Sequence, residues 1–237
     1  AQRDCVGVAS PCNHFDLNDS EDGSEFIRHG FTGNTMTEIF QADTYLIRKK
    51  VLKIFGGSFH IYSDDSQTEL LGFCRLKAFK LKEDIRIYSD EEMTTELLTI
   101  KAKSILDISA GYDVVDAQTG ASLGGYKRKG LKSIIKDTYE LYDQAGNTYA
   151  ELSEDSRGLA LTRRFVPLAN ILIPQVFHLR GGDGRGSVDY TQKMNPIVQR
   201  LVVKGAQSGG FDPRVVLAGG ILLASIEGQQ GGVGLID

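Results

Sequence analysis

The chain has 237 residues, of which 41% are hydrophobic and 24% charged, an ordinary composition for a globular protein that folds without disulfides or a structural metal. The net charge of -4 argues against a protein that binds nucleic acid in bulk. Three cysteines, Cys5, Cys12 and Cys74, form no CxxC pair, so the sequence supports neither a disulfide framework nor a thiolate zinc site. A reducing compartment, and hence a cytoplasmic location, is the expectation.

The first part of the chain differs from the rest in composition. Residues 1–35 carry six acidic and two basic side chains among Ser, Asn and Gly, without a regular apolar pattern. We expect a poorly ordered acidic leader or extension at 1–35, one folded domain at 36–230 and a Gly-rich tail at 231–237. The whole net charge then belongs to the leader, and the rest of the chain is neutral.

An internal repeat follows the leader. Four segments each contain two short apolar or aromatic runs around a polar turn, at 59–77, 85–101, 112–127 and 139–152. Tyr62, Tyr88, Val115 and Tyr142 hold equivalent places in them, at steps of 26, 27 and 27 residues. β-Branched and aromatic runs bounded by Asp, Gly, Asn and Gln are typical of β-hairpins.

Further strands are expected before and after these hairpins. A strand pattern begins near residue 44, a fifth hairpin covers 175–192, and another strand covers 197–203. The stretch 159–173 reads as a short helix and a connection. Ten to twelve strands in a meander protect their edges by closing, so we expect a mainly β protein with a closed antiparallel barrel or a sandwich.

The C-terminal region predicts one helix. Asp212 is a good N-cap, Pro213 fits the first helical position, and Gly228 fits just past the end. The twelve residues 215–226 carry no charge, and at 1.5 Å each they span only about 18 Å, too short for a bilayer core of about 30 Å. We therefore expect a helix buried inside the barrel, with no transmembrane span. Its inner residues are Val215, Leu217, Gly219, Gly220, Leu222, Leu223 and Ile226, the two glycines allowing close approach of barrel side chains.

Two basic clusters are the leading candidates for a binding site. The first is Lys127, Arg128, Lys129, Lys132 and Lys136, which contains no acidic residue and interleaves with Leu131, Ile134 and Ile135. Cations beside apolar side chains suit an anionic membrane surface. The second is Arg48, Lys49, Lys50 and Lys53, which strand alternation divides between two faces. The alternative for both clusters is a solvated surface.

Catalytic and metal-binding patterns are sparse. His60 and His178 lie in separate hairpins, and Cys74 lies within a strand, where a small buried hydrophobic side chain is the expectation. Residues 125–133 lack the lysine that a phosphate-binding loop requires. We expect no enzyme activity and no cofactor. A weak calcium site in the acidic turns at 64–65 and 90–92 is the remaining alternative.

Several strings of residues carry a family resemblance. They are DTYLIRKK at 43–50, FGGSFHIY at 55–62, KAFKLKEDI at 77–85, TTELL at 94–98, YDVVD at 112–116, DPR at 212–214 and IEG at 226–228. Together they resemble the LURP-one-related proteins, which belong with phospholipid scramblases and Tubby C-terminal domains in the tubby-like group. The resemblance covers roughly 36–230 and implies a barrel of about twelve strands around a hydrophobic C-terminal helix.

For function, the resemblance implies phosphoinositide binding or calcium-stimulated lipid scrambling. The chain lacks the proline-rich segment and the cysteine cluster of animal scramblases. We therefore expect a non-enzymatic domain that binds anionic phospholipid or phosphoinositide headgroups, as a peripheral protein on the inner face of a membrane. The alternatives are lipid translocation and a protein-interaction module with no lipid ligand.

Overall fold

A computed structural model describes residues 38–50, 57–64, 66–76, 84–103, 111–129, 138–155, 174–182, 184, 186–194 and 198–230. The helices within these residues are the short 3-10 helix η1 (Ile39–Gln41) and the α-helix α4 (Pro213–Gln230). The strands are β1 (Thr44–Lys50), β2 (Gly57–Tyr62), β3 (Leu70–Leu76), β4 (Ile85–Tyr88), β5 (Glu96–Ala102), β6 (Gly111–Asp116), β7 (Ser122–Arg128), β8 (Thr138–Tyr142), β9 (Thr148–Glu154), β10 (Gln175–Gly181), β11 (Ser187–Met194) and β12 (Val198–Lys204).

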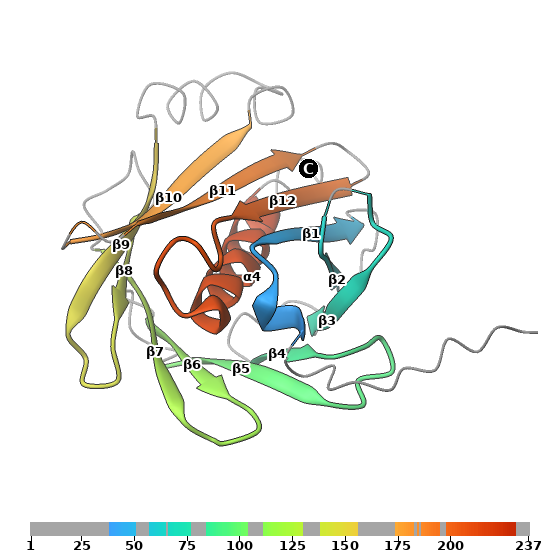
Figure 1. Ribbon diagram of the computed structural model, residues 1–237, viewed down its shortest axis with the longest axis horizontal. Coiled ribbons are helices and arrows are strands. Elements are labelled where there is room, and N and C mark those ends of the chain that lie inside the picture. Colours follow the sequence, from blue (N-terminus) through green and yellow to red (C-terminus); the bar gives the residue numbers. More distant parts are fainter. Residues whose placement is uncertain are drawn as a thin grey trace, which may run out of the picture. The chain divides into compact units, whose positions relative to one another are not determined.

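The twelve strands form one closed antiparallel barrel in which each strand pairs with its neighbour in sequence. The first and last strands complete it, because β1 pairs with β12 from Thr44↔Lys204 to Lys50↔Val198. Figure 1 shows the strands surrounding α4. The expectation of a mainly β fold with an enclosed C-terminal helix is confirmed. Of the two expected architectures, the strands form the closed barrel and not the sandwich. The expected helix and connection at 159–173, and the proposed leader and tail, lie outside the described residues.

The predicted repeat has a local physical basis in its turns. An aspartate stands at or just after the end of the first strand in each of four successive hairpins: Asp64, Asp90, Asp116 and Asp143. Each of these carboxylates accepts a hydrogen bond from a backbone N–H of its own turn. These bonds measure 2.8 to 3.1 Å and replace the ladder bonds that the chain loses where it reverses direction. The 26- or 27-residue period is therefore the period of an aspartate-capped hairpin.

Helix α4 occupies the centre of the hydrophobic core. Residues 215–224 are all buried, as expected for a helix that is apolar on every face. Tyr126 and Tyr190 donate their hydroxyls to the backbone carbonyls of Val215 and Val216, at 2.8 and 3.0 Å. These bonds satisfy the tyrosines inside the barrel and fix the first turn of the helix against β7 and β11.

The two central glycines make the predicted close contacts. A Cβ at Gly219 would lie 2.8 Å from Cζ of Tyr126, and one at Gly220 would lie 2.8 Å from Cδ1 of Ile47. Both distances are shorter than real Cβ contacts, so only glycine fits at these positions without movement of the barrel wall. The predicted helix end was wrong by a few residues: α4 continues through Gly228 to Gln230, because one glycine in a last turn costs only about 1 kcal/mol.

Candidate functional site

The first basic cluster lies at the end of β7 and beyond it. Lys127, Arg128 and Lys129 are exposed, whereas Lys132 and Lys136 lie outside the described residues. The register places Lys127 opposite Glu140 of β8, and Glu140 opposite Glu151 of β9. The described part of the cluster therefore faces two carboxylates that the neighbouring strands contribute.

These carboxylates compensate the outward-facing lysines. The Lys129 Nζ lies 2.8 Å from Glu151 and 3.8 Å from Glu140, and the Lys127 Nζ lies 3.6 Å from Glu140. The pKa of Lys129 is raised, chiefly by its hydrogen bond to Glu151. The two positive charges of Lys127 and Lys129 are thus balanced by the two negative charges of Glu140 and Glu151. This balance weakens the electrostatic attraction of the surface for an anionic headgroup.

The second basic cluster is divided between the two faces of β1, as alternation predicted. Ile47 packs in the core, so Arg48 points outward and Lys49 points to the inner face. The Lys49 Nζ lies 5.3 Å from the centre of the Phe59 ring, and burial lowers the pKa of this lysine. Lys53 and the side chain of Lys50 are not among the described parts.

Arg48 belongs instead to a group that only the barrel assembles, which we call the cationic row: Lys193, Arg200 and Arg48. The β11–β12 register places Lys193 opposite Arg200, and the β12–β1 register places Arg200 opposite Arg48. Lys193 and Arg200 are exposed and Arg48 is half-buried. Among the described residues none of the three forms an ion pair, and the buried Arg48 Nε has no hydrogen-bond partner.

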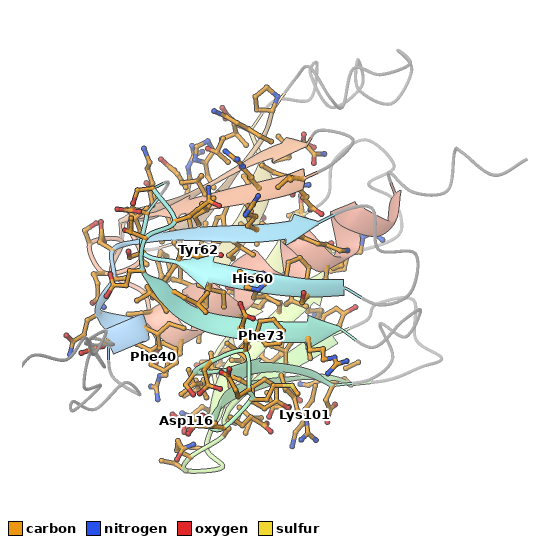
Figure 2. The ribbon with its side chains drawn as sticks, turned by 90° about the vertical axis from the view of Figure 1, so that its right-hand side faces the viewer. Phe40, His60, Tyr62, Phe73, Lys101 and Asp116 are labelled. Carbon is orange, nitrogen blue, oxygen red and sulfur yellow. The ribbon has the colours of Figure 1, made fainter. Side chains whose placement is uncertain are left out.

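Aromatic side chains extend the cationic row onto the next strands. His60 of β2 lies opposite Arg48, and Phe73 of β3 lies opposite His60. The His60 ring meets the Phe73 ring edge-on at 5.3 Å and stacks on Tyr62 at 6.3 Å. Figure 2 shows these three rings on the outer side of β2 and β3. The nearest carboxylate that the structure pairs here is Glu91, 2.9 Å from His60 Nε2.

Lys193 and Arg200 were not among the predicted site residues. Each is a single cation inside an alternating strand, flanked by buried Gln192 or by buried Gln199 and Leu201. Alternation alone would have placed both on the outer face. Their position beside Arg48 follows only from the pairing of the last strand with the first, across about 150 residues of sequence.

The residues considered for catalysis take structural positions. Cys74 is fully buried and its pKa is raised to about 12 by burial, which confirms the expected hydrophobic role. His178 lies between two carboxylates, 2.6 Å from Asp189 and 3.6 Å from Asp155. Within the described ranges, no group of three or more His, Cys, Asp or Glu side chains is arranged to hold a metal ion. Oδ1 of Asp64 and both carboxylate oxygens of Asp90 accept hydrogen bonds within their turns.

No described helix has both the length and the hydropathy needed to span a bilayer. No protein-family model matches the chain, and no curated protein or solved structure matches it. The resemblance to the LURP-one-related proteins therefore stays a prediction.

Proposed function

We propose that this chain is a non-enzymatic binding domain that docks on anionic phospholipid headgroups at the cytoplasmic face of a membrane, with the cationic row as the contact. The observation that carries the proposal is the alignment of Lys193, Arg200 and Arg48 on three adjacent strands without ion-pair partners among the described residues. Neighbouring strands lie about 4.8 Å apart, so the row spans roughly 10 Å, the scale of one headgroup phosphate cluster.

Electrostatics gives the row a reason to bind an anion. Like charges directly opposite each other on paired strands destabilise a sheet, and an anion between them removes that repulsion. Each Lys or Arg near an anionic bilayer contributes about 1 kcal/mol, so three contribute about 3 kcal/mol, or roughly a hundredfold in affinity. The half-buried rings of His60 and Tyr62, with His60 packed edge-on against the buried Phe73, supply the amphipathic surface that suits the headgroup region.

The test compares two variants with the same change in charge. In the row variant, Lys193, Arg200 and Arg48 are replaced by Gln; in the control variant, Lys127, Arg128 and Lys129 are. Co-sedimentation with phosphatidylcholine vesicles, with and without phosphatidylserine or phosphatidylinositol bisphosphate, measures binding. We expect the wild type to bind only the anionic vesicles and to lose binding at high salt.

The row variant should bind anionic vesicles roughly a hundredfold more weakly, and the control variant should keep most of its affinity because Glu140 and Glu151 already compensate Lys127 and Lys129. A thermal melt establishes that both variants fold, and removal of like charges should make the row variant no less stable than the wild type. A wild type that ignores anionic vesicles, or a row variant that binds as the wild type does, would overturn the proposal.

A further inference from the structure

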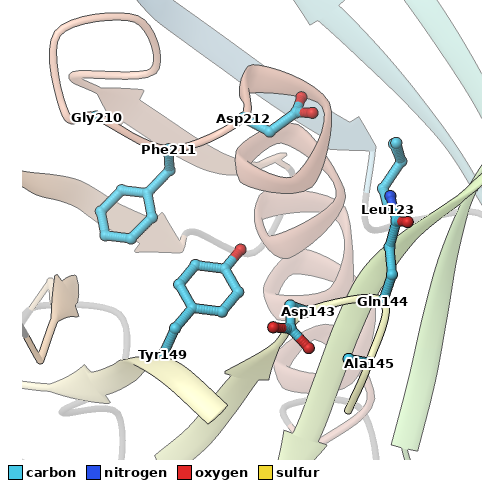
Figure 3. Close-up of a pocket in the computed structure, with 8 residues that line it drawn as sticks. All are labelled: Leu123, Asp143, Gln144, Ala145, Tyr149, Gly210, Phe211 and Asp212. Carbon is cyan, nitrogen blue, oxygen red and sulfur yellow. The ribbon is translucent and has the colours of Figure 1, made fainter. Parts of the chain in front are cut away.

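A hollow of about 500 Å³ lies where α4 begins, lined by Leu123, Asp143, Gln144, Ala145, Tyr149, Gly210, Phe211 and Asp212. Its walls come from β7, from the β8–β9 hairpin and from the segment that leads into the helix. Figure 3 shows Tyr149 and Phe211 on one side, Leu123 opposite them and Asp143 below. This volume holds an organic molecule of several heavy atoms.

Two aromatic rings form one side of the hollow. The ring centres of Tyr149 and Phe211 lie 6.4 Å apart, with an angle of 32° between the ring planes. Phe211 is held rigidly, because only 7% of its surface is exposed. Tyr149, near the start of β9, is half-buried and packs against the core. An aromatic ring attracts a cation placed within about 6 Å of its centre, and quaternary ammonium groups are bound by such rings.

The carboxylates of the hollow are not equivalent. Both oxygens of Asp212 are bonded to Arg214, at 2.6 to 3.2 Å, and Arg214 also pairs with Asp116 at 2.8 Å. Asp143 has no cationic partner among the described residues; it accepts the N–H of Asn147 at 2.8 Å and its side-chain amide at 3.3 Å. Those donors lower the pKa of Asp143, so it is ionised at neutral pH. The hollow therefore has a negative charge beside an aromatic wall.

From this arrangement we infer that the hollow binds a small organic monocation of the alkylammonium or choline type, with its cationic group beside Asp143 and against the rings of Tyr149 and Phe211. The uncompensated charge of Asp143 disfavours ligands that also carry a phosphate, because Asp143 would repel that phosphate. Choline should therefore bind better than phosphocholine. This site is separate from the cationic row and does not depend on it.

The experiment titrates the full chain with choline and follows the backbone N–H resonance of Asn147 by heteronuclear NMR, because that N–H is bonded directly to the Asp143 carboxylate. The uncharged isostere 3,3-dimethylbutan-1-ol has the shape of choline without its charge, and phosphocholine and trimethyllysine are titrated in parallel. We expect saturable shifts with choline, weaker binding at high salt, and little response to the isostere or to phosphocholine. A stronger response to trimethyllysine than to choline would identify a protein side chain as the source of the cation.

Three single-residue variants test whether Asp143 and Tyr149 contribute to choline binding. Asp143→Asn keeps an acceptor for the turn but removes the charge, and Asp90→Asn makes the same change in the equivalent turn, where Asp90 accepts the N–H of Thr94. Asp143→Asn and Tyr149→Leu should each weaken choline binding about two- to tenfold, and Asp90→Asn should leave it unchanged. Absence of choline binding to the wild type, equal binding of the isostere, or equal effects of the two Asn variants overturns the inference.

Discussion

The fit between Gly219 and the barrel wall gives a quantitative test of how α4 is held. In Gly219→Ala, the new methyl group would lie 2.8 Å from Cζ of Tyr126, so the ring must move. Overpacking a core costs about 1 to 3 kcal/mol, and the Tyr126 hydroxyl bond to Val215, which is lost with that movement, contributes about 1 kcal/mol. Against this, Ala is favoured over Gly in a helix by about 1 kcal/mol.

The net expectation is a loss of about 1 to 3 kcal/mol in the free energy of unfolding, and a Tm lower by roughly 5 °C for a chain of this size. Thermal and urea unfolding followed by circular dichroism measure both quantities. Gly182→Ala, in the turn after β10, is the control for a glycine without close neighbours, because its Cβ would meet nothing closer than 3.9 Å. Combining Gly219→Ala with Tyr126→Phe should cost about 1 kcal/mol less than the sum of the two single changes, since they share one contact.

A Gly219→Ala protein as stable as the wild type would refute the tight contact, because helix propensity would then outweigh the steric cost. Strict additivity with Tyr126→Phe would refute it as well, since it would show that the methyl group and the hydroxyl do not compete for the same space.

The protonation of Asp43 should contribute to acid unfolding. The pKa of Asp43 is lowered in the folded protein, chiefly by the hydrogen bond from the backbone N–H of Ser208. The ionised carboxylate therefore stabilises the fold above the unfolded pKa of about 3.9, and this stabilisation is lost as the pH falls through the folded pKa. Urea unfolding as a function of pH should therefore show a shallower acid limb for Asp43→Asn than for the wild type, and identical slopes would contradict this linkage. Cys74 should resist alkylation in the native protein, because burial raises its pKa to about 12, and it should react only on unfolding. A Cys5→Ser/Cys12→Ser background isolates this thiol, and native labelling at the rate of a free cysteine would show that the interior opens.

The repeat could be read from the sequence because its causes are local. An aspartate such as Asp143 binds the backbone of its own turn, so the turn is specified within five residues. The buried helix could also be predicted from the sequence, since an uncharged segment too short for a bilayer must be enclosed by protein. The close contacts at Gly219 and Gly220 follow from that enclosure.

The binding surface was harder to predict from the sequence, because the strand register decides which charges lie opposite each other across a sheet. Lys127 and Lys129 form a basic run in sequence, yet the adjacent strands bring Glu140 and Glu151 against them. Nothing within ten residues of Lys129 reveals Glu151 as its partner. Basic residues that are close in sequence therefore need not form a basic patch on the surface of the folded protein.

The sequence by itself determined the hairpins, the number of strands to within two, and a buried C-terminal helix, because alternation, turn chemistry and the absence of charge act over a few residues. The tertiary structure decided which cations stand together. Barrel closure joins strands from opposite ends of the chain, and it places Arg48 beside Arg200 and Arg200 beside Lys193. Pairing register is fixed by the packing of the whole inner face, so no local pattern could have specified it.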